Sequence, residues 1–126
     1  MADFSKKILI VEDDDSLRNI LLDQLALNYS VIPAADGAEA LEQIKTFHPD
    51  LILLDLLLPK IDGFKILKQL RSLPDPKDSN THVIVISNLS DPESIKKITE
   101  LKIDEYFTKA DIDLGTLKGR INAILL

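Results

Sequence analysis

The sequence predicts an α/β fold in which a parallel five-stranded sheet lies between two layers of helices, a doubly wound three-layer sandwich. Short runs that are almost wholly apolar recur along the chain, as is typical of strands buried on both faces of a parallel sheet. Segments with apolar residues at helical spacing separate these runs. Four runs end in, or lead straight into, residues that can bind phosphate or metal. They are residues 8–11, 51–54, 83–86 and 106–108.

The predicted strands and helices alternate along the whole chain. The strands cover residues 7–11, 29–34, 51–55, 82–87 and 105–108. The helices cover residues 15–27, 38–47, 64–73, 91–101 and 113–126. Five strand–helix units in series favour a parallel sheet with right-handed crossovers.

The first two helices are expected to be amphipathic, with one face toward the sheet. The inward face of the first consists of Leu17, Ile20, Leu21 and Leu25, and that of the second of Ala40, Leu41 and Ile44. The strand between them contains Pro33, which has no backbone N–H and therefore indicates the end of the strand or an edge of the sheet. Asp36 and Gly37 form the turn into the second helix.

The rest of the chain continues this alternation. A loop at residues 59–63 leads into the third helix. The inward face of that helix consists of Phe64, Leu67 and Leu70. Residues 73–81 are the longest polar connection and are expected to be the most mobile segment. The fourth helix has a clear start, with Asp91 as its cap and Pro92 in its first turn.

The composition limits the class of protein. A chain of 126 residues without a linker-like segment is expected to be a single domain, residues 1–126. Its 15 basic and 21 acidic residues give a formal net charge of −6, which argues against nucleic acid as a direct partner. The absence of cysteine excludes disulfides, thiolate metal sites and cysteine nucleophiles. Because there is no membrane-length apolar stretch and no signal-peptide pattern, we expect a cytoplasmic protein that does not contact the membrane.

Three carboxylates are expected to meet at one edge of the sheet. Glu12 and Asp13 follow the first strand, and Asp55 ends the third. The carboxyl ends of parallel strands share one edge, where open α/β folds bind ligands. An unpaired carboxylate after so apolar a run would be costly unless a divalent cation joined it, and oxygen ligands suit Mg²⁺. Asp14 and Asp15 continue the acidic run, but we interpret them as solvated residues that cap the next helix.

Asp55 is the natural nucleophile of the set, because an aspartate can attack phosphorus and form an acyl phosphate. The metal would screen the incoming phosphate oxygens and align them for in-line attack. Ser87 ends the fourth strand and Lys109 follows the fifth, so a hydroxyl and an ammonium reach the same edge. Taken singly, Ser87 would be a loop cap and Lys109 a surface lysine. Their shared position at strand ends favours contact with a phosphoryl group.

Four segments together resemble the signature segments of bacterial two-component response-regulator receiver domains. They are residues 8–14 (ILIVEDD), residues 54–59 (LDLLLP) with Asp62 and Gly63, residues 85–87 (VIS) and residues 106–109 (YFTK). The resemblance covers essentially the whole chain, in order and in spacing. It implies a flavodoxin-like fold with strand order 2-1-3-4-5 and five helices.

The resemblance also implies what the site does. Asp55 would be the phosphoacceptor, and Ser87 and Lys109 would contact the phosphoryl group. The donor would be a sensor histidine kinase or a histidine phosphotransfer protein. The signal would pass to a downstream protein target or to a fused output domain, which this chain does not include.

The metal ligands follow from the same resemblance. Asp13 and Asp55 would contact Mg²⁺, Glu12 would act through water, and the backbone carbonyl of Leu57 would be the other protein ligand. Glu12 stands where the family more often has aspartate, and Ser87 where it more often has threonine. Both replacements are expected to be tolerated.

In this family the hydroxyl is coupled to an aromatic residue on the fifth strand, a position that Tyr106 matches. A phosphoryl group on Asp55 would draw Ser87 inward and let Tyr106 rotate into the vacated space. This would reshape the surface made by the fourth helix, the fifth strand and the fifth helix. A half-buried aromatic at a sheet edge is the plainer interpretation of Tyr106. Phe107 is expected to face the opposite side of the sheet as part of the core.

Two departures from the family pattern carry expectations of their own. Ala110 stands where the family usually has proline, typically after a cis peptide bond. A cis bond before alanine would cost about 3–4 kcal/mol, so we predict a trans bond between Lys109 and Ala110. Leu57 and Leu89, which flank the phosphoryl position, are apolar and cannot orient an attacking water. We therefore expect slow self-dephosphorylation.

Two other classes of function stay open at this point. A Mg²⁺-dependent phosphatase that forms an aspartyl phosphate would also use Asp55, but such enzymes usually have a second acid where this chain has Leu57. A docking module that is never phosphorylated would not need the complete set of Glu12, Asp13, Asp55, Ser87 and Lys109. The sequence therefore favours a phosphoryl-accepting switch over a turnover enzyme.

Overall fold

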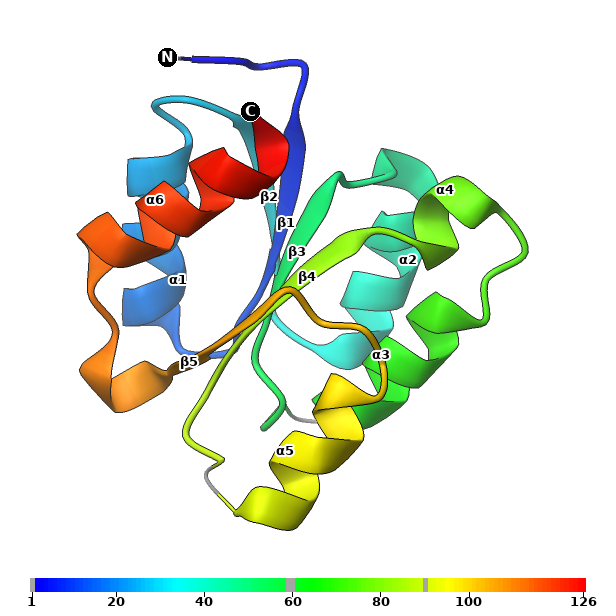
Figure 1. Ribbon diagram of the computed structural model, residues 1–126. Coiled ribbons are helices and arrows are strands. Elements are labelled where there is room, and N and C mark those ends of the chain that lie inside the picture. The colour runs from blue at the N-terminus through cyan, green and yellow to red at the C-terminus, as the bar shows by residue number, and fades with distance from the viewer. Residues whose placement is uncertain (1, 59–60, 90) are drawn as a thin grey trace.

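Five parallel strands form one sheet in the computed structural model, which describes residues 2–58, 61–89 and 91–126 (Figure 1). The strands are β1 (Lys7–Val11), β2 (Ser30–Ala34), β3 (Leu51–Leu54), β4 (His82–Ser87) and β5 (Glu105–Thr108). Their order is β2-β1-β3-β4-β5, which confirms the flavodoxin-like arrangement. The helices are α1 (Asp15–Leu25), α2 (Gly37–Phe47), α3 (Gly63–Arg71), α4 (Pro76–Ser79), α5 (Pro92–Thr99) and α6 (Leu114–Leu125), and η1 (Lys109–Asp111) is a 3₁₀ turn.

Helices cover both faces of the sheet because apolar side chains point alternately to either side of each strand. In β1, Ile8 and Ile10 pack in the cluster that contains residues of α1 and α6. Leu9 and Val11 pack in the cluster that contains residues of α2, α3 and α5. Figure 1 shows these two groups of helices on opposite sides of the sheet. The three-layer sandwich is confirmed.

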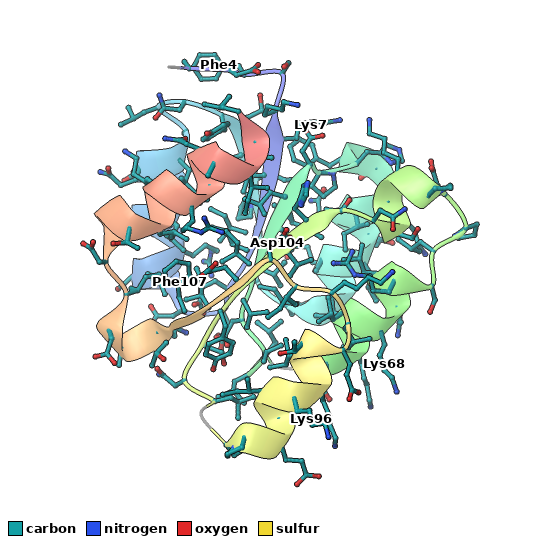
Figure 2. The ribbon with its side chains drawn as sticks, viewed as in Figure 1. Phe4, Lys7, Lys68, Lys96, Asp104 and Phe107 are labelled. Carbon is teal, nitrogen blue, oxygen red and sulfur yellow. The ribbon has the colours of Figure 1, made fainter. Side chains whose placement is uncertain are left out.

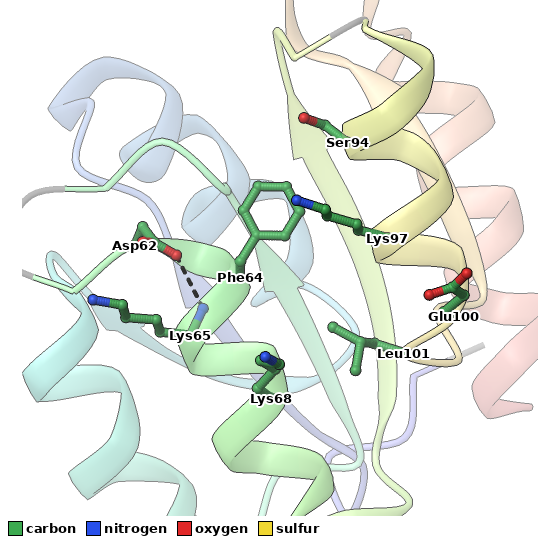
Figure 3. A pocket seen from close by; sticks show the side chains of 8 residues that line it. All are labelled: Asp62, Phe64, Lys65, Lys68, Ser94, Lys97, Glu100 and Leu101. Carbon is green, nitrogen blue, oxygen red and sulfur yellow. Dashed lines mark hydrogen bonds between the residues drawn. The ribbon is translucent and has the colours of Figure 1, made fainter.

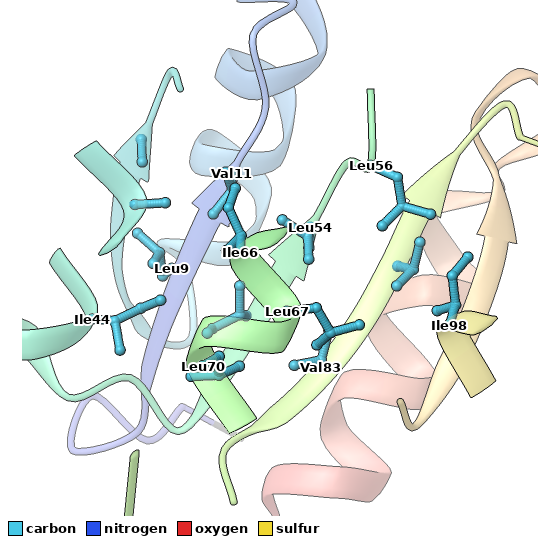
Figure 4. Packing of buried hydrophobic residues seen from close by; sticks show 14 residues of the cluster. Leu9, Val11, Ile44, Leu54, Leu56, Ile66, Leu67, Leu70, Val83 and Ile98 are labelled. Atoms are coloured by element: carbon cyan, nitrogen blue, oxygen red, sulfur yellow. The ribbon is translucent and has the colours of Figure 1, made fainter. Parts of the chain in front are cut away.

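Aliphatic side chains fill the space between the sheet and the layer of α2, α3 and α5 (Figure 4). Ile44, Leu67, Leu70 and Ile98 come from the helices and are almost completely buried. Burying an aliphatic side chain of this size contributes about 1.5–3 kcal/mol. The sheet is thus a rigid support for the loops at its carboxyl edge.

The predicted inward face of α1 is only partly right. Leu21 and Leu25 are buried, but the side chain of Ile20 is 48% exposed. Ile20 lies about 100° around the helix from Leu21, on the side away from Leu25. The position therefore turns toward solvent, although its spacing from Leu17 is helical.

One helix is absent from the prediction. α4 is a single turn within the polar connection at residues 73–81, so the described part of the chain has six α-helices and not five. Asp75 caps it by accepting a hydrogen bond of 3.0 Å from the N–H of Lys77, and Pro76 occupies its first turn. Apolar spacing could not reveal this helix because four residues are too few to show a periodic face.

Each of the six α-helices begins after an aspartate that accepts hydrogen bonds from backbone N–H groups of the first turn. These residues are Asp14, Asp36, Asp62, Asp75, Asp91 and Asp113. A negative charge at the positive end of the helix dipole is favourable, so part of the acidic composition stabilises helices.

In the predicted loop at residues 59–63, Pro59 and Lys60 lie outside the described residues.

The edge position of Pro33 is confirmed. Among the described residues β2 is an outer strand that pairs with β1 alone, and Pro33 lies opposite Ile10 in that pairing. A proline on an outer strand costs no ladder hydrogen bond where its nitrogen faces away from the sheet. None of the described helices combines the length and the apolar character needed to cross a membrane.

Candidate functional site

Loops at the carboxyl edge of the sheet carry the predicted site residues. Glu12 follows β1, Asp55 follows β3, Ser87 ends β4, and Lys109 follows β5. β1 and β3 are paired in register up to their last residues. Glu12 and Asp55 therefore leave neighbouring strands at the same level.

Glu12, Asp13 and Asp55 converge, as predicted. One carboxylate oxygen from each lies within 4.8 Å of the other two. Glu12 and Asp55 are each only 3% exposed, whereas Asp13 faces solvent. The three acids thus form a cluster of oxygen atoms that is open on the Asp13 side.

The ammonium group of Lys109 lies between the two buried carboxylates. Its Nζ is 2.8 Å from Oε1 of Glu12 and 3.0 Å from Oδ2 of Asp55. Burial raises the pKa of Glu12, the hydrogen bond from Lys109 lowers it, and the charge of Asp55 raises it again, so that it ends above its usual value. Burial lowers the pKa of Lys109, but its hydrogen bonds to both carboxylates outweigh this, so its pKa is raised. One charged ammonium therefore contacts two of the three acids.

Hydrogen bonds hold the loop after β1. The N–H of Asp14 donates to Oε2 of Glu12 (3.0 Å), and Nη1 of Arg18 donates to the backbone carbonyl of Glu12 (2.9 Å). Arg18 also pairs with the exposed Asp15. Asp14 caps α1, as predicted, and the acidic cluster consists of Glu12, Asp13 and Asp55 without Asp14 or Asp15. Arg18 was missed because no spacing pattern marks an arginine that binds a carbonyl in the preceding loop.

A close approach at Gly63 shapes the loop after β3. A Cβ atom on Gly63 would lie 2.4 Å from the Cα of Leu56, so no other residue fits without a backbone shift. The N–H of Leu57 donates to Oδ1 of Asp55 (3.0 Å) and orients that carboxylate. The role of the Leu57 carbonyl as a metal ligand stays a prediction. Pro59 of the signature segment lies outside the described residues.

Ser87 and Tyr106 lie on paired strands, and Tyr106 reaches the loop after Ser87. Ser87 is fully buried, and its hydroxyl accepts a long hydrogen bond of 3.5 Å from the N–H of Leu89. The hydroxyl of Tyr106 donates to the backbone carbonyl of Leu89 and lies 3.3 Å from that of Ser87. The rotation of Tyr106 stays a prediction. Phe107 packs on the α1 and α6 side of the sheet, which confirms its predicted face (Figure 2).

A second group of potential ligands lies outside the carboxyl-edge loops. His48, Asp75 and Asp78 each offer an atom within 4.8 Å of the others. Nδ1 of His48 lies 2.8 Å from Oδ1 of Asp78, and this contact joins the end of α2 to α4. The pair has a structural role, because it ties the extra helical turn to the rest of the domain.

A hollow of about 530 Å³ lies between α3 and α5 (Figure 3). Phe64 and Leu101 line it together with Lys65, Lys68 and Lys97. Phe64 is therefore only half-buried, although the sequence places it on the inward face of the helix. The hollow includes none of the predicted phosphoryl, metal or switch residues, so the acidic edge is the candidate site.

These observations define a class of protein: a doubly wound α/β domain with a carboxylate and lysine site at the carboxyl edge of its sheet. The model of the response regulator receiver domain family matches residues 8–122. The chain belongs to this family. It is a receiver domain of two-component signalling, as its signature segments indicate.

Individual relatives agree with this assignment. The chain is 39% identical over 121 residues to the probable transcriptional regulator ycf27 of Porphyridium aerugineum, covering 95% of this chain and 48% of that protein. It is 39% identical over 123 residues to the alkaline phosphatase synthesis transcriptional regulatory protein PhoP of Bacillus subtilis (strain 168), covering 96% and 49%. The chain thus spans about half the length of these relatives. The receiver domain of Francisella response regulator 1452 is 31% identical, with a TM-score of 0.82 and coverage of 94% of this chain and 95% of that one.

Proposed function

We propose that residues 1–126 act as a single receiver domain that accepts a phosphoryl group on Asp55. The observation that carries this proposal is the setting of the Asp55 side chain. It is buried at the end of β3, with Oδ2 bonded to Lys109 and Oδ1 to the N–H of Leu57. Both oxygens are therefore oriented before a phosphoryl donor arrives, which lowers the entropic cost of attack.

The acidic cluster fits Mg²⁺. Glu12, Asp13 and Asp55 supply only oxygen atoms, and a single ammonium leaves them with excess negative charge. Asp13 and Asp55 would hold the ion, with Glu12 acting through water and the Leu57 carbonyl as a further ligand. When bound, the ion would neutralise the oxygens of the incoming phosphoryl group.

The donor in this proposal is a histidine kinase or a histidine phosphotransfer protein. A carboxylate oxygen of Asp55 attacks the phosphorus of a phosphohistidine, the P–N bond breaks, and the imidazole leaves with the bonding electrons. The ammonium of Lys109 and the hydroxyl of Ser87 then contact phosphoryl oxygens and stabilise their charge. We place this exchange in the cytoplasm on the strength of the family assignment.

The surface change would begin at the loop after β4. Tyr106 donates a hydrogen bond to the carbonyl of Leu89 in this loop, which follows Ser87 directly. An inward movement of Ser87 would alter this contact and the position of α5 beyond it. The surface of α5, β5 and α6 would carry the signal to a protein partner, and we propose no direct contact with nucleic acid or membrane.

Mass spectrometry of the intact chain after treatment with acetyl phosphate and Mg²⁺ tests the proposal. We expect an added mass of about 80 Da, that of one phosphoryl group. The adduct should be absent in Asp55→Asn and present in Asp23→Asn, a control at an exposed acid of α1. Continuous turnover of a phosphate ester would indicate a phosphatase instead, and the lack of any adduct in the wild type would indicate a docking module.

A further inference from the structure

The 3₁₀ turn η1, which begins with Lys109, is capped by a side chain from another loop. Thr108 precedes the turn, but its side chain makes no capping hydrogen bond. The N–H of Ala110 donates instead to Oδ1 of Asn88, at 3.0 Å and 22 positions earlier in the chain. The first N–H groups of a helical turn need an acceptor, and the loop after β4 supplies this one.

This contact joins the two loops that carry the phosphoryl-contacting residues. Asn88 directly follows Ser87, and Ala110 directly follows Lys109. The pairing of β4 with β5 ends where Ser87 lies opposite Thr108. The side-chain hydrogen bond therefore extends the connection of the two strands beyond their last paired residues.

The bond requires a residue other than proline at position 110, because its donor is the backbone N–H. A proline, which the family pattern usually has there, has no N–H to donate and restricts the backbone through its ring. In this chain the Lys109–Ala110 peptide bond is trans, as predicted, and no ring restricts residue 110. The hydrogen bond that Ala110 donates to Asn88 restricts the backbone after Lys109 in place of the ring.

We propose that Asn88 is a positioning residue for phosphorylation: through Ala110 it holds the turn that directs the Lys109 ammonium between Glu12 and Asp55. This role rests on the proposed function of Asp55 as the phosphoacceptor. The ammonium lies within 3.0 Å of both carboxylates, so a small shift of its backbone would lengthen both contacts. The bond also links any movement of the Ser87 loop to Lys109.

Hydrogen exchange in the unphosphorylated chain tests the contact itself. In Asn88→Ala we expect the amide of Ala110 to exchange about fivefold faster than in the wild type, the factor that one ordinary hydrogen bond supplies. Asn88→Asp keeps the acceptor atom and should keep the protection. Asn19→Ala, at an exposed asparagine of α1, is the matched control and should change nothing.

The rate of adduct formation with acetyl phosphate and Mg²⁺ tests the role. We expect Asn88→Ala to react about fivefold more slowly than the wild type, with an unchanged affinity for Mg²⁺. Ala110→Pro removes the donor and fixes the backbone by its ring. In that background Asn88→Ala should therefore have no further effect, which a double-mutant cycle measures directly.

Several results would overturn the role of Asn88. The role would be wrong if Asn88→Ala did not change the rate of adduct formation. It would also be wrong if Asn88→Ala lowered this rate by the same factor in the wild type and in the Ala110→Pro background. If Ala110→Pro does not fold, the two other variants decide: the amide of Ala110 must lose its protection in Asn88→Ala and keep it in Asn88→Asp. A wild type that takes up no phosphoryl group would overturn the proposed function together with this role, whereas a normal adduct with an unaffected Asn88→Ala would overturn the role alone.

Discussion

An apolar side chain faces solvent beside the proposed phosphoacceptor. The N–H of Leu57 is bonded to Asp55, and the side chain of Leu57 is 55% exposed. Leu89, the other flanking residue, packs against the cluster of α2, α3 and α5, and its carbonyl accepts from Tyr106. Of these two leucines, only Leu57 is therefore free to affect how water approaches the phosphoryl group.

Leu57→Asn should shorten the life of the phosphorylated form. An amide can hydrogen-bond a water molecule and orient it toward phosphorus, so we expect the phosphoryl group to be lost about tenfold faster. The half-life is measured by intact mass after acetyl phosphate is removed. Leu27→Asn, at a leucine that is 63% exposed outside the carboxyl-edge loops, should leave the half-life unchanged. An unchanged half-life in Leu57→Asn would contradict the expectation of slow self-dephosphorylation.

At the scale of elements, Arg71 joins the end of α3 to two segments distant in sequence. Its guanidinium donates to the carbonyls of Ser79 (3.0 Å) and Thr81 (2.7 Å), which lie at the end of α4 and before β4. It also donates to the carbonyls of Leu101 (2.8 Å) and Lys102 (2.7 Å), which follow α5. Burial lowers the pKa of Arg71. The connection at residues 73–81 is thus tied at its end to the same side chain as the segment after α5.

Arg71→Lys should therefore lower the stability of the domain. Lysine keeps the charge, but its ammonium cannot reach all four carbonyls from one position. We expect the free energy of unfolding, measured by urea denaturation, to fall by about 2–3 kcal/mol. Arg120→Lys is the matched control, because Arg120 forms an exposed ion pair of 3.3 Å with Glu105, and this substitution should change stability by less than about 1 kcal/mol. Equal losses in the two variants would show that the carbonyl contacts are not the cause.

At the scale of the whole molecule, the negative charge has two different uses. Aspartates at the starts of the six described α-helices stabilise the fold, because they accept hydrogen bonds at the positive ends of helix dipoles. Glu12, Asp13 and Asp55 instead form one cluster in which Lys109 contacts Glu12 and Asp55, and the charge of Asp55 raises the pKa of Glu12. A cation that binds this cluster should therefore stabilise the folded state.

Magnesium should raise the free energy of unfolding of the wild type. At a concentration about 100 times its dissociation constant, the gain expected from linkage is about 2.7 kcal/mol. Calorimetry supplies the dissociation constant, and urea denaturation with and without Mg²⁺ measures the gain. Asp13→Asn should lose most of it, whereas Asp15→Asn should keep it because Asp15 pairs with Arg18 outside the cluster. Equal gains in both variants would place the ion elsewhere.

Features that depend on local sequence or on regular spacing could be predicted from the sequence alone. Apolar runs mark the strands, and the rule that parallel strands share one carboxyl edge brings Glu12 and Asp55 together. The confirmed strand order rested on the family resemblance and not on the runs themselves. The short helix α4 was missed because its capping signal at Asp75 has no apolar face to support it.

Contacts between a side chain and a distant backbone group could not be predicted from any sequence pattern. The hydrogen bond between Ala110 and Asn88 joins a side chain to a backbone group, and so does each of the four hydrogen bonds of Arg71. Nearly every residue has such a backbone group, so the residue type at the backbone end does not indicate the contact. The sequence was enough to place the acids and the lysine at one sheet edge, because periodicity and strand direction are properties of the chain. Tertiary packing decided which loops are connected and how the Lys109 ammonium contacts both Glu12 and Asp55. The distances between these groups are set only when the helices pack against the sheet.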